Sequence, residues 1–274
     1  MIAFAPPATV PAAHRPAVRD YLSWSAVTTY QQCPLKYCYR YIEQAPEECQ
    51  SASLVFGGAI HAALEAHFTA LLAGAPPPTL DQLLAAYHAA WSEVDLPRVD
   101  FGSQHDLASL ARLAERMLAA FQASPLARPN GTILAIEEEL RAPLLPDVPD
   151  LLGRLDLVVE TDDAVQVIDF KTSRSRWSAD QVTEAGGQLL LYSRLASDLA
   201  EPKPVRLSFV VLTKTKTPDV SVHDVPFRPA QLDRTLRIVQ HVWRGIQSGN
   251  FYPVPSALNC PSCPFRQRCA RWTG

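Results

Sequence analysis

The stretch Gly153-Arg154-Leu155-Asp156, followed by Ile168-Asp169-Phe170-Lys171-Thr172, decides the fold of this chain. Apolar alternation and β-branched side chains predict strands over residues 152–160 and 165–171, joined by a short turn. Residues two apart in a strand share a face about 6.6 Å apart, so Asp169 and Lys171 point the same way. Pairing of the two strands brings Asp156 beside them. Two carboxylates and a lysine are therefore expected to converge on one point.

Two carboxylates and a lysine have the chemistry of a metal-assisted phosphodiester hydrolase. Paired carboxylates raise one another's pKa unless a divalent cation lies between them, and oxygen ligands favour Mg²⁺ or Mn²⁺. Such a cation makes a bound water more acidic, and a neighbouring ammonium orients that water or stabilises charge on phosphorus. The spacing alone leaves an alternative open, in which Asp156 begins a turn while Asp169 and Lys171 form an exposed strand pair.

Length and composition set the wider limits. The 274 residues, 47% of them hydrophobic, allow one large domain or one domain with a helical insertion. A formal charge of −3 excludes the overall basic balance of a non-specific nucleic-acid coat protein. A nucleic-acid path therefore requires a local basic strip, or these residues are simply solvated. The candidates for such a strip are Arg174, Arg176, Lys203, Arg206, Lys214 and Lys216.

The sequence predicts a cytoplasmic protein without a membrane partner. We find no apolar run of about 18 residues and no signal-peptide order of charge, apolar core and cleavage site. In a cytosolic chain, the six cysteines are expected to be metal ligands or free thiols rather than disulfides.

The predicted strand pair is surrounded by helical patterns. Residues 1–21 hold four prolines and few large apolar groups, which predicts a flexible lead-in. Residues 74–130 are interpreted as a helical insertion beside the core. Helices are expected from Ser23 or Ser25 to Cys33-Pro34, over about 56–73, 80–94, 106–123 and 229–247, and from Ser178 or Asp180 past Tyr192; further strands are expected over 132–140, 205–213 and 220–225.

Further side chains outside the strand pair are candidates for the site. His61, near a helix start, is either a ligand or substrate contact or a packed structural histidine. On the strand over 132–140, Glu137 and Glu139 are expected on one face and Glu138 on the other; one of them joins the metal cluster, or they form a solvated acidic edge. Gln188 and Tyr192 lie four apart, hence on one helical face.

The C-terminal segment carries a second candidate metal site. Cys260, Cys263 and Cys269 lie within ten residues, and prolines follow two of them. This density predicts a centre holding zinc or an iron–sulfur cluster. Cys33, which is also followed by proline, is the candidate fourth ligand, so the centre would join the N-terminal helix to the tail. The remaining cysteines, Cys38 and Cys49, are interpreted as non-ligands.

Together these motifs resemble the PD-(D/E)xK nuclease superfamily, in its RecB-like branch with an iron–sulfur staple, as in the AddB nuclease domain and the CRISPR-associated iron–sulfur exonucleases. The resemblance covers most of residues 22–271 outside the helical insertion. Leu155 stands where the family has a proline, at a position that varies in this branch. The motifs are Ser23-x-Ser25 with Tyr30-x-x-Cys33-Pro34, Gly57-x-x-x-His61-x-x-Leu64-Glu65, Gly153-Arg154-x-Asp156, Ile168-Asp169-Phe170-Lys171-Thr172, Gln188-x-x-x-Tyr192 and the three final cysteines.

The resemblance implies an α/β fold with a mixed central β-sheet flanked by helices, the restriction-endonuclease-like core, with a helical insertion at 74–130 and an iron–sulfur-stapled tail at 260–269. It implies a metal-dependent deoxyribonuclease, expected to be a single-stranded DNA exonuclease in repair, recombination or CRISPR adaptation. A helicase or a CRISPR integration protein would be its partner. The alternatives are a non-catalytic DNA-binding clamp, which has no need of an intact Asp156, Asp169 and Lys171, and a zinc-stapled structural domain.

The resemblance also implies a role for each matching residue. Lys171 would be the catalytic lysine, and Glu137 would match the acidic position on the preceding strand. The Mg²⁺ or Mn²⁺ ligands would be His61, Asp156, Asp169 and the Phe170 carbonyl; the DNA contacts would be Gln188 and Tyr192, with Arg174 and Arg176 nearby; the [4Fe–4S] ligands, now preferred over zinc, would be Cys33, Cys260, Cys263 and Cys269.

Overall fold

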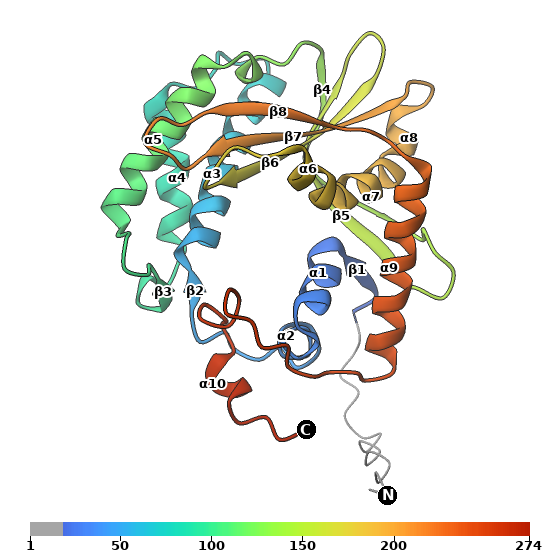
Figure 1. Ribbon diagram of the computed structural model, residues 1–274. Coiled ribbons are helices and arrows are strands. Elements are labelled where there is room, and N and C mark those ends of the chain that lie inside the picture. The colour runs from blue at the N-terminus through green and yellow to red at the C-terminus, as the bar shows by residue number, and fades with distance from the viewer. Residues whose placement is uncertain (1–18) are drawn as a thin grey trace, which may run out of the picture.

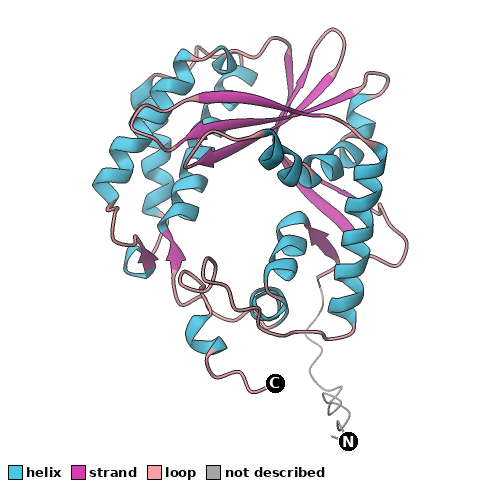
Figure 2. Cartoon of the chain, viewed as in Figure 1, coloured by secondary structure: helices cyan, strands magenta, loops and turns pink. Residues whose placement is uncertain are grey.

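A six-stranded mixed sheet runs through the centre of the protein, and helices cover both of its faces (Figures 1 and 2). The structure, a computed structural model, describes residues 19–274; the predicted lead-in lies mostly outside the described residues. The sheet order is β1-β5-β6-β7-β8, with β4 paired to β5. The strands are β1 (Tyr21–Ser23), β4 (Thr132–Ala142), β5 (Asp150–Glu160), β6 (Val165–Ser173), β7 (Val205–Thr213) and β8 (Val220–Val225).

The helices follow the predicted order, with short elements between them. A separate two-stranded parallel sheet joins β2 (Gln50–Ser51) to β3 (Val99–Asp100). The helices are α1 (Trp24–Gln32), α2 (Pro34–Tyr37), the π-helical turn η1 (Cys38–Ile42), α3 (Ala52–Leu72), α4 (Leu80–Ser92), η2 (Leu96–Arg98), α5 (Leu107–Ala123), η3 (Pro125–Ala127), α6 (Ala179–Ala185), α7 (Gly187–Leu195), α8 (Ser197–Ala200), α9 (Pro229–Gln247) and α10 (Arg266–Cys269).

Strand β5 has different neighbours along one of its edges. β4 pairs with nearly the whole length of β5 in antiparallel register. On the other edge, β1 runs parallel to residues 150–152, and β6 pairs antiparallel with residues 157–160. Residues 153–156 of β5 therefore have no partner on that edge among the described strands. The sheet divides here, and the predicted motif Gly153-Arg154-Leu155-Asp156 occupies the division.

Strands β6 and β7 are parallel along their whole length, from Val165 beside Val205 to Ser173 beside Thr213. The connection between them runs through α6, α7 and α8, as a parallel crossover requires. β8 then returns antiparallel to β7, which confirms the predicted hairpin. The carboxyl ends of β6 and β7 consequently meet at one edge of the sheet, beside the start of α3 (Figure 1).

Two hydrophobic cores lie on opposite faces of the sheet. One core unites α1, α7 and α9 with residues of β5, β6 and β7. The other unites α3, α4 and α5 with residues on the opposite face of the same strands, including Leu157, Phe170 and Leu212. The predicted helical insertion thus packs directly on the sheet, and its apolar residues such as Leu113 and Met117 complete that core.

Helix α3 is the one described helix that is long and apolar enough to cross a membrane by length and composition. Its apolar residues Phe56, Ile60, Leu64 and Phe68 are buried in the core against the sheet. A core helix passes such a test as readily as a membrane helix, so α3 is explained by packing.

A capping serine and a glycine explain why two helix boundaries differ from the predicted ones. Ser51 caps α3, so the helix begins at Ala52 and the two glycines of the predicted start lie inside it. The single helix predicted after Ser178 is two helices, because the chain bends at Gly186. A side chain at Gly187 would meet the Trp24 ring at 2.8 Å, so the glycine lets α7 pack closely against α1.

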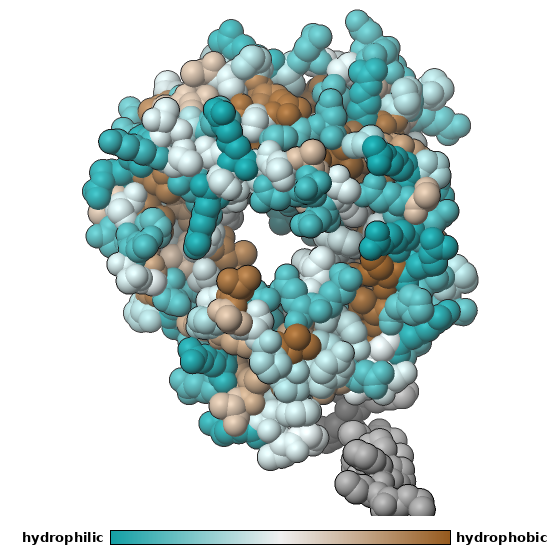
Figure 3. Space-filling view, viewed as in Figure 1, coloured by the Kyte–Doolittle hydropathy of each residue, from teal (hydrophilic) through white to brown (hydrophobic). Residues whose placement is uncertain are grey.

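The C-terminal tail closes the molecule into a ring. After α9, the chain runs back beneath the sheet and pairs with the N-terminal segment: Leu35 N donates to Tyr252 O at 3.0 Å, and Glu48 N donates to Pro264 O at 2.8 Å. Sheet, α3, tail and α1 surround an opening through the centre, which the space-filling view shows (Figure 3).

Candidate metal-dependent active site

Asp156 lies where the pairing of β5 and β6 ends. Its Oδ2 accepts a hydrogen bond of 2.7 Å from the Phe170 backbone N–H, which the divided ladder leaves without a strand partner on that side. His61, two turns into α3, faces the same carboxylate, with Nδ1 at 3.5 Å from Asp156 Oδ2. The side chain of Asp156 is 11% exposed. The structure therefore brings these two predicted ligands together.

Asp169 and Lys171 share one face of β6, as the strand period predicts. Lys171 Nζ lies 2.6 Å from Asp169 Oδ2, and the Asp169 side chain is 2% exposed. The ammonium compensates the buried carboxylate charge, as a buried charge requires. A divalent cation ligated by Asp169 would add to this compensation.

Glu137 is the glutamate of β4 that joins the site. Its Oε1 lies 3.9 Å from His61 Nδ1, and its Oε2 lies 2.6 Å from Arg154 Nε. Glu137 has a φ of 50°, although the register of β4 on β5 runs unbroken from Ile136 to Ala142. Glu138 is exposed, and Glu139 lines a cavity instead.

The donor set fits a divalent cation. Among the described residues, His61, Glu137 and Asp156 form a group whose ligand atoms all lie within 4.8 Å of one another. Two carboxylates and an imidazole suit Mg²⁺ or Mn²⁺ with open water positions. Asp169 lies outside this group but close enough to Asp156 for its charge to raise the pKa of Asp156. A hydrogen bond with the Phe170 backbone also reaches His61.

The protonation of this cluster responds to burial. Burial, followed by the neighbouring Asp169 carboxylate, raises the pKa of Asp156 to about 8. Burial also raises the pKa of Glu137 and lowers the pKa of His61. Without a cation, burial thus shifts all three groups toward their neutral forms, and the Arg154 guanidinium opposes this shift at Glu137. A divalent cation would reverse the shift at the carboxylates.

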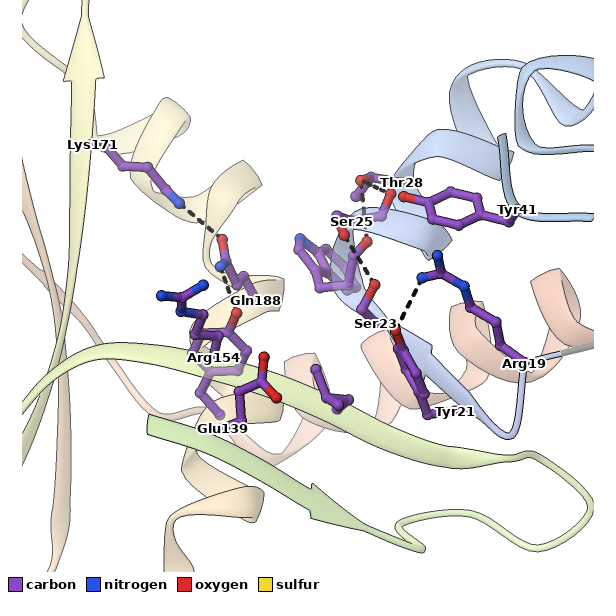
Figure 4. Close-up of a pocket in the computed structure, with 13 residues that line it drawn as sticks. Arg19, Tyr21, Ser23, Ser25, Thr28, Tyr41, Glu139, Arg154, Lys171 and Gln188 are labelled. Atoms are coloured by element: carbon purple, nitrogen blue, oxygen red, sulfur yellow. Dashed lines mark hydrogen bonds between the residues drawn. The ribbon is translucent and has the colours of Figure 1, made fainter. Parts of the chain in front are cut away.

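A row of hydrogen bonds links the lysine to α7. Lys171 Nζ donates to Gln188 Oε1 at 3.1 Å, and Gln188 Nε2 donates to the Tyr192 hydroxyl at 2.9 Å (Figure 4). Burial raises the pKa of Tyr192 to about 12, so the hydroxyl stays protonated. Gly153 makes room for this packing, since a Cβ there would lie 2.6 Å from the Tyr192 ring.

A cavity of about 600 Å³ opens beside Lys171 and Gln188. The close-up shows these side chains with Arg154 and Glu139 on one side, facing α1 and Tyr41 on the other (Figure 4). Arg154 has no role in the sequence-based prediction, although it lies within the quoted motif, because its pairing with Glu137 depends on the register of β4 and β5. The full lining is Arg19, Tyr21, Ser23, Trp24, Ser25, Thr28, Tyr41, Glu139, Leu152, Arg154, Lys171, Gln188 and Tyr192.

The six residues offered as candidates for a basic strip do not lie together. Lys203 pairs with Glu160, and Arg206 pairs with Asp163, both at the amino ends of β6 and β7, far along the strands from Lys171. Strand direction therefore separates residues that are close in sequence. Arg176 lies beyond the carboxyl end of β6 and pairs with Asp219 at 3.0 Å, while Arg174 is exposed at the same end.

The four cysteines of the predicted cluster gather where the tail meets α2. Cys33, Cys263 and Cys269 pack around the same small core that contains Phe265. Burial, followed by the neighbouring thiolates of Cys33, Cys263 and Cys260, raises the pKa of Cys269. Within the described part of the chain, no three of these sulfur atoms form a group within 4.8 Å. A metal centre at these four cysteines therefore stays a prediction.

The other two thiols, Cys38 and Cys49, have different neighbours, and Cys49 lies near enough to Cys263 for its charge to act on it. Cys38 donates to Glu43 Oε1 at 3.6 Å, and burial, with the charge of Glu43, raises the pKa of Cys38 to about 12. Burial also raises the pKa of Cys49. Burial raises the pKa of Cys269 in the same direction, so these shifts do not separate ligands from non-ligands, and the interpretation of Cys38 and Cys49 as non-ligands stays a prediction.

A divided mixed sheet that presents carboxylates, an imidazole and a lysine beside an open cavity is typical of metal-dependent enzymes that act on phosphate esters. The chain belongs to the PD-(D/E)XK nuclease superfamily, whose family model matches residues 21–270. A search of curated proteins finds no match.

Two solved structures are similar to the chain. The crystal structure of a candidate exonuclease from Eubacterium rectale has a TM-score of 0.60 at 14% identity, covering 93% of this chain and 90% of that one. At this identity, the likeness concerns the fold. The structure of SSO0001 covers 91% of this chain and 96% of its own, at 15% identity and a TM-score of 0.34, too low to support an argument.

Proposed function

We propose that this protein is a metal-dependent deoxyribonuclease that degrades single-stranded DNA from an end. The observation that carries the proposal is the half-buried group of His61, Glu137 and Asp156, with the buried Asp169 and its partner Lys171 beside it. Membership of the nuclease superfamily supports the same reaction class. A clamp or a structural domain has no need of three acidic side chains, an imidazole and a lysine gathered beside an open cavity.

Each residue has a distinct part in phosphodiester hydrolysis. A divalent cation held by His61, Asp156 and Asp169, with the Phe170 carbonyl, would supply an acidic water and draw charge from the phosphate. Lys171 directs its ammonium at developing negative charge, and Gln188 holds that ammonium in place.

Two further side chains support these roles. Glu137 faces His61, and Arg154 balances its charge, so the acidic cluster is neutralised on the side of the cavity. Tyr192 fixes the amide of Gln188, and through it the direction of the lysine.

The ring shape favours a strand that enters by its end. The central opening passes beside the cavity that contains Lys171, Gln188 and Arg154 (Figures 3 and 4). A duplex is about 20 Å wide by the groove dimensions of B-DNA, whereas a single strand is far thinner. A polymer threaded through a closed ring must have a free end, which is the physical basis of exonuclease preference.

We further propose that Cys33, Cys260, Cys263 and Cys269 hold a [4Fe–4S] cluster that keeps the ring closed, with zinc as the alternative. Contacts around the site already support such a clasp: Glu48 accepts from the backbone N–H groups of Gln267 and Arg268 at 3.0 and 3.1 Å. The setting would be cytoplasmic DNA repair, recombination or CRISPR adaptation, with a helicase or an integration protein supplying the strand.

The first test is cleavage of labelled single-stranded DNA by anaerobically purified protein with Mn²⁺, Mg²⁺ or EDTA. Linear strands labelled at the 5′ or 3′ end report the polarity, and a closed circular single strand of equal sequence reports whether an end is required. We expect the linear strands to be degraded with either metal, and the circle to persist.

The control is Asp169→Ala, which should be inactive although folded. Degradation by that variant would point to a contaminating nuclease and leave the proposal without support. Equal degradation of circles and linear strands would replace the exonuclease by an endonuclease. Binding of DNA without any cleavage, with metal present and the cluster intact, would favour the non-catalytic clamp.

A further inference from the structure

Two cationic side chains, Lys214 and Arg174, lie at the carboxyl ends of β6 and β7, away from the proposed ligands of the divalent metal ion. Lys214 directly follows β7, and its backbone N–H donates to Ser173 O of β6 at 2.6 Å. Its Nζ donates to Ser53 Oγ, in the first turn of α3, at 2.9 Å, and lies 5.8 Å from the Phe56 ring centroid. The ammonium of Lys214 thereby bridges the sheet to α3. Arg174 follows Ser173 on the neighbouring strand.

No acidic group balances these two charges among residues 19–274. The nearby carboxylate of Asp219 is already paired with Arg176, with Nε and Oδ2 3.0 Å apart. Neither Lys214 nor Arg174 forms an ion pair with a described residue. Burial, followed by the charge of Arg174, lowers the pKa of Lys214, as expected of a partly desolvated ammonium near a second cation. An anion between them would offset both charges.

The distance from Lys214 and Arg174 to the candidate active site can be estimated along two elements, α3 and β6. Along α3, Ser53 and His61 are eight residues apart, which is about 12 Å at 1.5 Å per residue. Along β6, Asp169 and Ser173 are four residues apart, which is about 13 Å. The rise per nucleotide is about 3.4 Å in a stacked strand and roughly twice that when fully extended. The separation therefore corresponds to about two nucleotides of an extended strand.

We propose that Ser53, Lys214 and Arg174 form a phosphate subsite, which binds a phosphodiester of the substrate strand about two nucleotides from the bond that is cut. The position of the bound phosphate relative to the cut bond rests on the proposed nuclease function. The binding of DNA by the subsite does not require cleavage. The Ser53 hydroxyl and the first turn of a 21-residue helix add hydrogen-bond donors and a favourable dipole to the two cations.

Binding tests the subsite without catalysis. The affinity for a fluorescent single-stranded oligonucleotide with a 5′-hydroxyl end is measured in EDTA by anisotropy, over a range of salt concentrations. Neutralising one phosphate contact changes the slope of log affinity against log salt by about 0.7. We expect a loss of this size in the double variant Lys214→Gln/Arg174→Ala. Gln retains a donor for Ser53, so the fold is preserved.

The matched control is Arg206→Ala, which removes a cation from the opposite end of β7, where Arg206 pairs with Asp163. The control should keep the slope of the unmodified protein, and Lys214→Arg should restore most of the affinity that Lys214→Gln loses. Equal slopes for the double variant and the unmodified protein would overturn the subsite, even if DNA cleavage itself is normal. An effect seen only with 5′-phosphorylated strands would assign the cations to a terminal phosphate and overturn the internal position.

The register is tested by neutral methylphosphonates placed one at a time along the strand. With Mn²⁺ present, a neutral linkage two nucleotides from a given bond should slow cleavage of that bond about tenfold in the unmodified protein, and have little effect in the double variant. The same sensitivity in both proteins would overturn the assigned position. A protein that binds as predicted but never cleaves would instead refute the nuclease function and leave the phosphate site standing.

Discussion

The carboxylate of Asp156 accepts a hydrogen bond from the backbone N–H of Phe170 at 2.7 Å, where the pairing of β5 and β6 stops. The Asp156 carboxylate takes the place of the backbone acceptor that would come next in the β5–β6 ladder. The two strands separate from this point, and β1 pairs with the part of β5 that β6 leaves. One residue thus satisfies a buried backbone donor and faces the candidate cation site.

This double role predicts different effects for two substitutions of Asp156. Asp156→Asn keeps an oxygen that accepts from Phe170 and removes a poorly solvated charge, so its unfolding free energy in EDTA should equal or exceed that of the unmodified protein. Asp156→Ala leaves the N–H unpaired and should cost about 1–3 kcal/mol. Urea denaturation measures the stabilities, and Mn²⁺ titration followed by electron paramagnetic resonance should show weakened binding in both. Equal stability of the two variants would contradict the structural part of this role.

The raised pKa of Asp156 predicts a pH dependence of stability. In the unfolded chain the carboxyl group titrates near 3.9, whereas in the folded protein its pKa is about 8. Between these values the folded state holds more protons, so the unfolding free energy falls as pH rises. His61 has a lowered pKa and acts in the opposite direction below about pH 6.5. The clearest window is therefore pH 6.5–8.

Thermal unfolding in EDTA checks this dependence. The midpoint should fall from pH 6.5 to 8 in the unmodified protein and change less in Asp156→Asn. Saturating Mn²⁺ should stabilise the protein more at pH 8 than at pH 6.5, because the cation competes with the proton. A midpoint that rises with pH in EDTA would show that Asp156 is ionised throughout this window.

Gln188 is predicted to act through Lys171. Removing the amide in Gln188→Ala frees the Lys171 ammonium from its 3.1 Å hydrogen bond, so single-turnover cleavage should slow by about tenfold while Mn²⁺ affinity is unchanged. Lys171→Ala should reduce cleavage far more, and the double variant should be no slower than Lys171→Ala alone. A further loss in the double variant would mean that Gln188 contacts the substrate independently.

Features that depend on residues close in sequence could be predicted, whereas features that depend on contacts between distant residues could not. The strand period places Asp169 and Lys171 on one face, and a local pattern predicts every long helix. The division of the sheet at residues 153–156 could not be predicted, because it depends on β1 reaching β5 from more than 100 residues away. Likewise, the basic strip failed because Lys203 and Lys214, close in sequence, lie at opposite ends of the parallel strands.

Substitution by alanine is predicted to lower stability at Gly153 and to raise it at Gly58. Gly153→Ala places a methyl group 2.6 Å from the Tyr192 ring and 2.7 Å from Leu195, in a core that cannot yield cheaply, so stability should fall by about 1–3 kcal/mol. At Gly58, inside α3, a methyl group would have no described neighbour within 4 Å, so Gly58→Ala should raise stability by about 0.5–1 kcal/mol. Chemical denaturation compares both with the unmodified protein. A neutral Gly153→Ala would show that Tyr192 can move away, and cleavage should then reveal the loss of its support for Gln188.

Removing one predicted cluster thiol should open the ring without touching the cation site. Cys263→Ala, purified anaerobically, should lose iron, sulfide and absorbance near 400 nm, and its thermal midpoint should fall, because the tail is then held only by contacts such as Glu48 with Gln267. Cys49→Ala removes a thiol interpreted as a non-ligand and should keep the colour. Mn²⁺ binding by the His61 cluster should persist in both variants, since α3 and β5 are anchored by the sheet core. Stoichiometric zinc in place of iron would assign the four cysteines to a zinc site, and colour retained by Cys263→Ala would exclude that cysteine as a ligand.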